Sequence, residues 1–274
     1  MKPADIHSLV SGLRAEGKPF AVATVVRTVA ATAAKAGAKA VIGADGRISE
    51  GWIGGGCARV AVLKAALQSL KDGQPRLVSI QPEDLLGAQG LEPGEEKDGI
   101  RFAANMCPSK GTMDVFVEPV MPLPELVILG ASPVAVALAD LASRMGFRRT
   151  VAAPASEQSA FEDAERRIEG FALDASPEGR RYVVVSTQGR GDEAALRAAL
   201  SAEADFVAFV GSRAKARALR DKLAEGGVDP ELLTKVKAPA GLDIGAITPE
   251  EIALSILAEI VEINRRGALR EASE

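Results

Sequence analysis

Short apolar runs alternate with amphipathic segments along the second half of the chain. The apolar runs predict strands at 126–129, 150–152, 182–186 and 206–210, with shorter strands near 168–171 and 235–237. Helical periodicity follows at 134–145, 192–200, 214–225 and 249–265. The last helix opens with a capping box, in which Thr248 is the N-cap and Glu251 stands three residues further on. This alternation predicts right-handed βαβ units and a mainly parallel sheet.

The first half carries a mixed pattern of strands and one long helix, which predicts a mixed α/β domain. Strands are expected at 20–26, 77–80, 100–104 and 113–118, and a hairpin is expected to pair 38–42 with 47–53. The helix spans 57–70, with an apolar face formed by Val60, Leu63, Leu67 and Leu70. Segment 81–98 is polar and rich in glycine and glutamate, which predicts a surface loop.

Pro119, Pro122 and Pro124 mark the join between the two patterns. Proline is excluded from helix interiors and from central strands, so this segment is expected to be a linker. The sequence therefore predicts an N-terminal α/β domain over 1–121 and a C-terminal domain over 122–274.

Composition narrows the functional classes. The chain has 274 residues, of which 47% are hydrophobic and 26% are charged, as in globular proteins. Its net charge of −4 provides no basic face, which argues against nucleic acid and anionic membrane as partners. No apolar run is long enough for a signal peptide or a membrane span, so we expect a cytoplasmic protein. The single histidine, His7, excludes a Ser-His-Asp triad in the body of the chain and a histidine-rich zinc site.

Gly130 begins a strand–turn–helix segment that is similar to the dinucleotide-binding fingerprint Gly-x-Gly-x-x-Gly/Ala. Ala135 occupies the last position of this fingerprint, but Ser132 replaces its middle glycine. No acidic residue follows the next strand, where Ala153 and Pro154 stand and where a ribose hydroxyl would be bound. The helix N-terminus still favours an anion. We therefore expect a Rossmann-like domain that holds a phosphate-bearing ligand.

Two later loops carry further candidate binding residues. The run Gly211-Ser212-Arg213 follows a strand and begins a helix, with Ser212 as N-cap. Arg213 and Lys215 place positive charge in the first turn, which is unfavourable unless an anion lies nearby. Before the last helix, Gly241 fixes a loop in which Asp243 could accept hydrogen bonds from backbone or from a ligand hydroxyl.

The first half contains one comparable segment, in which Gly54, Gly55 and Gly56 precede Cys57 at the predicted start of the long helix. Consecutive glycines allow backbone N–H groups to form an anion-binding nest. A thiol at a helix N-terminus ionises more readily, so Cys57 is a candidate nucleophile or soft-metal ligand. Cys107 lies among turn-forming residues, and the predicted reducing compartment makes a disulfide between the two cysteines unexpected.

Together these segments resemble the XdhC/CoxI family of molybdenum-hydroxylase accessory proteins. The resemblance rests on GGGC at 54–57, the degraded fingerprint at 130–135, GSRxK at 211–215 and the long tail at 239–260, and it covers about 20–266. The stretch MCPSKGTMDVFVEP at 106–119 resembles the branch associated with aerobic carbon monoxide dehydrogenase-type enzymes. Two family features are missing, because the family's Thr-His pair reads Thr187-Gln188 here and its Ser-Pro-Arg is absent from 29–35.

The resemblance implies a maturation factor with molybdenum cofactor, as molybdopterin or its dinucleotide form, as its cargo. Such a factor assists sulfuration of the cofactor and its insertion into an apo molybdenum hydroxylase of the carbon monoxide dehydrogenase or xanthine dehydrogenase type. A cysteine desulfurase as sulfur donor and a homodimeric state are further expectations. In that case the cofactor-binding residues are the glycines, cysteines and loop residues described above, namely Gly54, Gly55, Gly56, Cys57, Cys107, Gly130, Ser132, Gly211, Ser212, Arg213, Gly241 and Asp243.

Two other hypotheses stay open at this point. An NAD(P)-binding oxidoreductase would use the Gly130 turn, with Arg148 and Arg149 as candidates for contacting the extra phosphate of NADP. A scaffold that docks a hydroxylase without binding a ligand would tolerate changes at Gly55 and Cys57. No constellation for acid–base catalysis is evident in the sequence, which favours a binding protein over a turnover enzyme.

Overall fold

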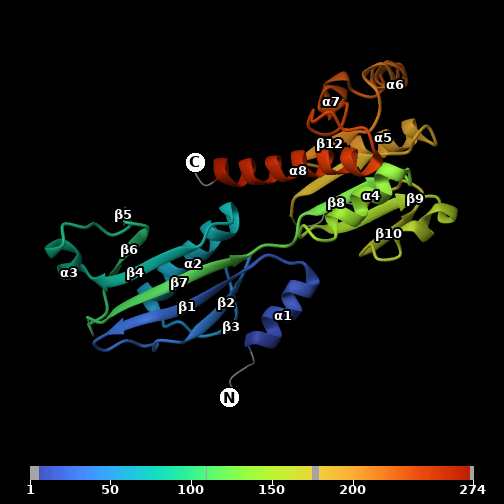
Figure 1. The fold of residues 1–274 in the computed structure, drawn as a ribbon. Helices are drawn as coiled ribbons and strands as arrows, with labels where there is room; N and C mark the ends of the chain where they lie inside the picture. Colours follow the sequence, from blue (N-terminus) through green and yellow to red (C-terminus); the bar gives the residue numbers. More distant parts are fainter. Residues whose placement is uncertain (1–5, 109, 175–178, 272–274) are drawn as a thin grey trace. The chain divides into compact units, whose positions relative to one another are not determined.

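A computed structural model describes residues 6–108, 110–174 and 179–271. The chain divides into two compact units (Figure 1). The first comprises the chain up to Pro122 together with the residues from Ala268 onward, and the second covers Leu123–Gly267. No helix among the described residues combines the length and the apolar character needed to cross a membrane.

The first unit is built on one mixed sheet. Among the described residues this sheet has seven strands in the order β3-β2-β1-β7-β4-β6-β5. Neighbouring strands are antiparallel, except that β4 and β6 are parallel. The strands are β1 (Phe20–Val29), β2 (Lys39–Gly43), β3 (Ile48–Gly51), β4 (Arg76–Pro82), β5 (Glu96–Lys97), β6 (Ile100–Asn105) and β7 (Thr112–Val120). The strands and the hairpin predicted from the sequence are confirmed.

Helix α2 (Gly56–Asp72) packs on this sheet, after the short helix α1 (Ile6–Glu16) that precedes β1. The helix buries Val62, Ala65 and Ala66 against the strands. The predicted apolar face is confirmed at Leu63 and Leu70, which pack against this core, and wrong at Val60 and Leu67, which are 68% and 44% exposed. Small alanine side chains bring the helix close to the sheet, and the larger aliphatic side chains at these two positions point away from it.

Segment 81–98 has more structure than its polar composition suggests. It contains helix α3 (Glu83–Ala88) and the strand β5. Leu86 is fully buried and forms a small cluster with Leu91 and Phe102. The prediction of a plain surface loop is therefore wrong. The linker prediction also needs correction at its start, because Pro119 lies in β7 opposite Ala21, beyond the last residue that pairs with β4.

The second unit is a doubly wound α/β domain. Within the described part of the chain its sheet has the order β10-β9-β8-β11-β12-β13, and every neighbouring pair is parallel. The strands are β8 (Glu125–Leu129), β9 (Arg148–Ala153), β10 (Arg166–Glu169), β11 (Arg181–Val185), β12 (Phe206–Phe209) and β13 (Val236–Lys237). The order reverses between β8 and β11, so the ligand-binding edge predicted for this topology lies at their carboxyl ends. The predicted Rossmann-like domain with a mainly parallel sheet is confirmed.

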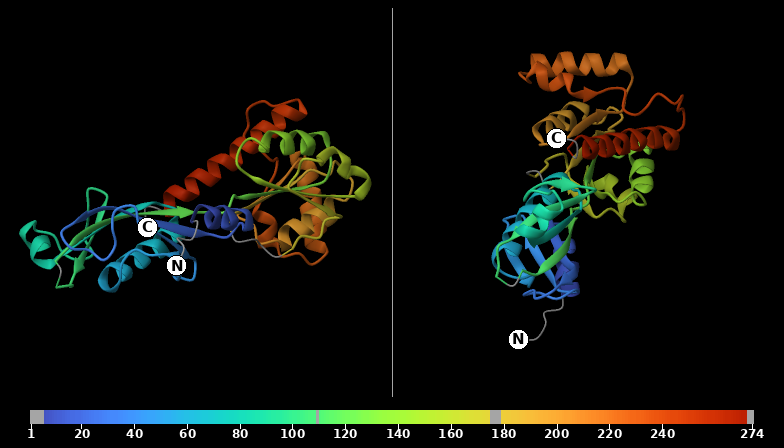
Figure 2. Two further views of the ribbon diagram at one scale, coloured as in Figure 1. Left: turned by 90° about the horizontal axis from the view of Figure 1, so that it is seen from below. Right: turned by 90° about the vertical axis from the view of Figure 1, so that its left-hand side faces the viewer.

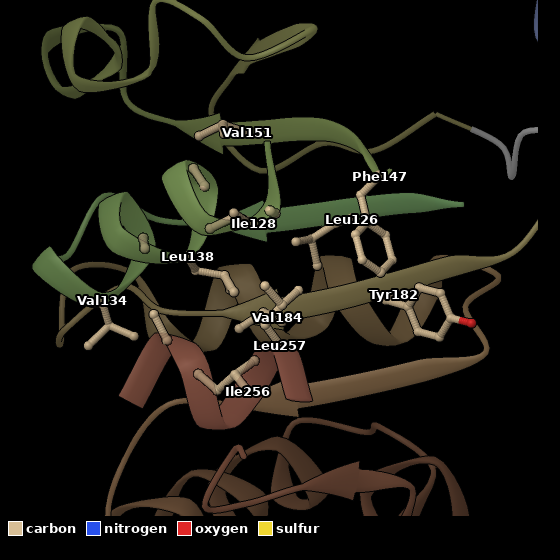
Figure 3. Close-up of a cluster of buried hydrophobic side chains, with 14 of the residues drawn as sticks. Leu126, Ile128, Val134, Leu138, Phe147, Val151, Tyr182, Val184, Ile256 and Leu257 are labelled. Atoms are coloured by element: carbon tan, nitrogen blue, oxygen red, sulfur yellow. The ribbon is translucent and has the colours of Figure 1, made fainter. Parts of the chain in front are cut away.

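Helices cover both faces of this sheet (Figure 2). They are α4 (Pro133–Ala142), α5 (Asp192–Ser201), α6 (Arg213–Glu225), α7 (Pro230–Thr234) and α8 (Pro249–Glu271), with a 3₁₀ helix η1 at Ala155–Phe161. Helices α4 and α8 bury their apolar residues on one face, and α5, α6 and α7 bury theirs on the other. Figure 3 shows the first of these cores, in which the rings of Phe147 and Tyr182 meet edge to face with centroids 6.1 Å apart.

The capping box predicted for the last helix is present. The Thr248 hydroxyl accepts the Glu251 N–H at 3.3 Å, and the Glu251 carboxylate accepts the Thr248 N–H at 3.0 Å. This reciprocal pair fixes where α8 begins, directly after the loop that precedes it.

Candidate functional site

The Gly130 turn between β8 and α4 is packed closed. A side chain on Gly130 would have its Cβ 2.5 Å from the carbonyl oxygen of Ser186, at the end of β11. Ser132 is buried, and its Oγ lies 2.6 Å from the Ser186 Oγ. The same oxygen accepts the Ala135 N–H at 3.2 Å as the N-cap of α4. The Ser132 hydroxyl is thus engaged inside the protein, at the place where a dinucleotide fingerprint needs a bare glycine.

The other features expected of a dinucleotide site are also missing. At the carboxyl end of β9 stand Ala153 and Pro154, without a carboxylate for a ribose. Arg148 and Arg149 begin β9 and so lie at the amino edge of the sheet, away from the ligand edge. The suggestion that they contact the phosphate of NADP is therefore wrong.

Arg149 has a structural partner instead. Its guanidinium donates to the Glu165 carboxylate at 2.9 and 3.0 Å and to Asp163 at 2.8 Å. The hydrogen bonds to Glu165, together with those to Asp163, raise the pKa of Arg149 despite its burial. This arginine joins β9 to the segment after η1 and serves the fold.

A cleft of about 680 Å³ opens at the carboxyl ends of β12 and β13. We call it the strand-end cleft. Its lining contains five of the six residues that the sequence singled out in the later loops of this unit, namely Gly211, Ser212, Arg213, Gly241 and Asp243, but not Lys215. Lys237, Ile252 and Ser255 also line it. Two loops that are well separated along the chain therefore come together on the edge where parallel α/β sheets bind their ligands.

The N-terminus of α6 forms one side of the strand-end cleft. Ser212 is the N-cap, and its hydroxyl accepts the Lys215 N–H at 3.2 Å. The first N–H groups of a helix have no partner within the helix, and the helix dipole makes this end positive. Arg213 adds an exposed guanidinium to the same wall. This side of the cleft is thus suited to an anionic group.

Lys215 does not share that role. Its ammonium lies 2.6 Å from the Asp192 carboxylate and 5.5 Å from the centre of the Phe209 ring. The predicted reason for a basic first turn is therefore wrong for this residue, since its partner is a protein carboxylate. Burial opposes ionisation of Asp192, but hydrogen bonds from Lys215, Thr187 and Gly189 outweigh it and lower its pKa.

The loop before α8 forms the opposite wall of the cleft. Glu259, a residue of α8, holds this loop in place. One oxygen of this buried carboxylate accepts the Gly241 N–H at 2.9 Å, and the other lies 2.9 Å from the Lys237 ammonium. Gly241 has φ of 94°, and a Cβ there would overlap the Ser255 hydroxyl. Sequence reasoning missed Glu259, Lys237 and Ser255. The signal for Glu259 was a carboxylate on the apolar stripe of the last helix, beside Ile260.

A second cavity, of about 330 Å³, lies in the first unit. Gly54, Gly55, Gly56, Cys57 and Cys107 all line it, so the five residues predicted in this half come together in one place. We call it the Cys57 pocket. Cys57 is the second residue of α2, as predicted, and the positive φ values of Gly54 and Gly56 shape the turn before it.

Asn105 holds the other side of the Cys57 pocket. Its side-chain oxygen accepts the Cys107 N–H at 3.0 Å, and its side-chain nitrogen donates to the Gly111 carbonyl at 2.6 Å. The turn that carries Cys107 is thereby tied to the start of β7. Sequence reasoning missed Asn105, as it missed Met106 and Met113, which also line the pocket.

Two protein-family models match this chain. A model described as "XdhC and CoxI family" matches residues 13–81, and one described as "XdhC Rossmann domain" matches residues 126–260. The chain belongs to the XdhC and CoxI family. The two matched segments include the Gly54–Gly56 turn, Cys57 and, apart from Glu125, all strands of the parallel sheet in the second unit.

Family relatives extend beyond this chain. It is 30% identical over 275 residues to an Escherichia coli (strain K12) protein named "Uncharacterized protein YqeB", covering 96% of this chain and 47% of that protein. It is 31% identical over 166 residues to a Bacillus subtilis (strain 168) protein named as a probable component of xanthine dehydrogenase, covering 58% of this chain and 48% of that protein. The chain thus spans about half the length of these curated relatives.

A solved structure of similar extent comes from Bacillus halodurans and is described as that of a xanthine dehydrogenase. The two chains are 21% identical, with a TM-score of 0.46 and coverage of 94% of this chain and 95% of that one.

Proposed function

We propose that this protein is a maturation factor for a molybdenum hydroxylase, which holds molybdenum cofactor and delivers it to the apo-enzyme. Membership of the XdhC and CoxI family supports an accessory role. The observation that carries the proposal is that the candidate binding residues of each unit, except Gly130 and Ser132, line one cavity of that unit. A binding protein needs such cavities. Among the described residues there is no histidine- or carboxylate-based metal cluster.

The strand-end cleft is our proposed site for the phosphate of the cofactor. Small-molecule sites have volumes of roughly 300–1,000 Å³, and the cleft falls within that range. Molybdopterin ends in a phosphate, or in a pyrophosphate in its dinucleotide form. Arg213 and the N-terminus of α6 would each stabilise that charge. Asp243 lies on the rim, where a carboxylate can accept hydrogen bonds from a pterin or ribose.

The Cys57 pocket is our proposed site for the sulfur chemistry of maturation. A thiolate is a suitable ligand for molybdenum and a suitable carrier of sulfur. A cysteine desulfurase would supply that sulfur. The client enzyme in this proposal is a molybdenum hydroxylase of the carbon monoxide dehydrogenase or xanthine dehydrogenase type, and the working form is a homodimer.

The test is to purify the protein from a host that makes molybdenum cofactor and to measure the fluorescent pterin released by oxidation. We expect pterin in stoichiometric amount. Arg213→Glu should lose most of it, because a carboxylate would repel the phosphate. Arg217→Glu, which changes an exposed arginine one turn further along α6, is the matched control and should retain it. A wild-type protein without pterin would overturn the proposal.

Delivery is tested separately with an apo-hydroxylase. Wild-type protein loaded with cofactor should restore hydroxylase activity, and light scattering should give the mass of a dimer. Cys57→Ser should keep its pterin but yield a hydroxylase without the sulfur that activity requires. Full activation by Cys57→Ser would remove the sulfuration role and leave the binding role intact.

A further inference from the structure

The loop before α8 is attached to that helix at both ends. The Glu259 carboxylate accepts the Gly241 N–H at 2.9 Å, and the Glu251 carboxylate accepts the Ile247 N–H at 2.8 Å. Hydrogen bonds from the backbone N–H groups of Thr248 and Ile247 lower the pKa of Glu251, so its carboxylate stays ionised at neutral pH. The two carboxylates belong to the same helix and are separated by about 12 Å along its axis. The chain between 241 and 247 therefore bridges two fixed points on α8.

Residues 243–246, which we call the strap, make few contacts of their own. Just before them, the Leu242 N–H donates to the Ser255 carbonyl at 3.2 Å. Within the part of the chain that the structure describes, the strap itself donates one backbone hydrogen bond, from the Ile244 N–H to the Leu242 carbonyl at 3.0 Å. A Cβ on Gly245 would meet no described heavy atom within 4 Å, and glycine adopts its φ of 73° without strain. The strap can therefore move while its ends stay attached.

The strap lies along an open cavity and carries an apolar side chain that the fold leaves in solvent. All four of its residues line the strand-end cleft. Ile244 is 55% exposed, although burial of such a side chain is favourable. Val210, Pro239 and Ile252 line the same cleft and make part of its wall apolar. The cleft thus combines the positive end of α6 with an apolar surface that the Ile244 side chain is able to complete.

The start of α8 has a second apolar side chain in solvent. A residue directly before an N-cap often packs on the fourth residue of the helix, a contact known as the hydrophobic staple. These positions are Ile247 and Ile252 here, since Thr248 is the N-cap. Ile247 is 85% exposed and so makes little of this contact, whereas Ile252 lies in the lining of the cleft. The chain therefore enters α8 in an open conformation, and inward movement of the strap would bring Ile247 toward Ile252.

We propose that the strap is a lid that closes over a ligand in the strand-end cleft. The anionic group of this ligand binds at Arg213 and the N-terminus of α6, and Ile244 covers a flat ring joined to that group. Molybdenum cofactor has both parts, a pterin ring and a terminal phosphate, so this choice of ligand rests on the proposed function. Closure excludes water from the ring and retains the cargo until a client enzyme takes it.

Hydrogen–deuterium exchange of the full-length chain tests closure. The probes are the fluorescent phosphorylated pterin obtained by oxidising molybdenum cofactor, the same pterin after phosphatase treatment, and inorganic phosphate. We expect the phosphorylated pterin to slow exchange of the strap amides by at least about tenfold, since these amides are poorly protected without a ligand. The other probes, which lack the phosphate or the ring, should leave exchange unchanged. Protection by none of the probes would overturn the lid, and equal protection by either incomplete probe would reject a ligand with two parts.

A pair of variants tests the contact between Ile244 and the ring. Ile244→Ser should speed release of the phosphorylated pterin by about 10- to 100-fold, because it removes an apolar contact made only in the closed state. Its urea midpoint should equal that of the wild type, because this side chain is largely exposed without a ligand. Leu254→Ser is the matched control, since Leu254 is 53% exposed on α8 and lies outside the described lining of the cleft. Equal release rates from the two variants would reject Ile244 as the covering residue.

The lid and the proposed function fail in different ways. If the protein purifies with pterin but the strap is not protected by any probe, the lid is wrong and the maturation role stands. If the protein purifies without pterin, yet added phosphorylated pterin protects the strap, the lid stands and the maturation role is wrong.

Discussion

The hydroxyl of Ser132 lies 2.6 Å from the hydroxyl of Ser186 and joins the turn after β8 to the end of β11. Both residues are buried. The pair crosses the point at which the strand order reverses, which is where dinucleotides bind in this topology. A contact between two small side chains thus occupies the position that a pyrophosphate would need.

Loss of this contact should lower the free energy of unfolding. Ser132→Ala removes the N-cap of α4 and leaves the Ser186 hydroxyl buried without its partner, so we expect a loss of about 1–2 kcal/mol. Urea denaturation followed by circular dichroism measures it. Ser143→Ala, at the exposed end of the same helix, is the control and should change stability by less than about 0.5 kcal/mol. Equal effects of the two changes would show that the contact is unimportant.

The same contact predicts weak or absent dinucleotide binding. Isothermal titration of the wild-type protein with NADH and NADPH should give no binding in the micromolar range. Ser132→Gly should not create binding alone, because no carboxylate follows β9 to hold the ribose. Micromolar affinity of the unmodified protein for NADPH would contradict this prediction and revive the oxidoreductase hypothesis.

Two glycines in the loop that lines the strand-end cleft should differ in how much stability is lost when each is replaced by alanine. Gly241 and Gly245 both have positive φ, of 94° and 73°, but only at Gly241 would a Cβ collide with Ser255. Gly245→Ala should cost about 1–2 kcal/mol from backbone strain. Gly241→Ala should cost a further 1–3 kcal/mol or so from overpacking and should displace the loop. Denaturation of both variants tests this, and equal losses would mean that the loop adapts.

Asp192 predicts a component of acid sensitivity. Its pKa is lowered in the folded protein by Lys215, Thr187 and Gly189, against the effect of burial. A lowered folded pKa means that the carboxylate contributes stability above the unfolded pKa of about 3.9 and loses that contribution as pH falls through the folded value. The stability difference between wild type and Asp192→Asn should therefore be largest near neutral pH and shrink below about pH 4.

The control for this measurement is Asp221→Asn, at an exposed position of α6. Unfolding midpoints in urea should be collected for the three proteins from neutral pH down to well below the ordinary carboxylate range. A difference between wild type and Asp192→Asn that does not vary with pH would show that Asp192 acts through its shape rather than its charge.

Much of the second unit could be predicted because its strands are buried on both faces. Parallel strands such as β8 and β11 read as unbroken apolar runs, and the glycine after β8 marks its turn. The capping box at Thr248 and Glu251 is a local signal, so it could be predicted without knowing the tertiary structure. The predicted loop residues Gly211, Arg213 and Gly241 came together because carboxyl ends of parallel strands share one edge.

Long-range pairs could not be predicted. No sequence feature near Ser132 indicates its contact with Ser186, which is 54 positions away. The closed conformation of the turn could therefore not be predicted. The predicted face of α2 was wrong at Val60 and Leu67 because periodicity favours large apolar residues, whereas the sheet is packed mainly by small ones such as Ala65 and Ala66. Arg149 stands just before the strand predicted at 150–152, so its position at the amino edge could have been inferred, but its partners Asp163 and Glu165 could not.

The small cluster of Leu86, Leu91 and Phe102 has a consequence for local opening of the first unit. It is separate from the core under α2 and joins α3, Leu91 and the strand β6. Burial of three side chains contributes much less to the free energy of unfolding than the main core does. The segment that contains α3 and β5 can therefore open locally while the central strands stay paired. Amide hydrogens of residues 83–97 should accordingly exchange with deuterium well before those of β1 and β7, giving the sheet a rigid centre and a labile margin.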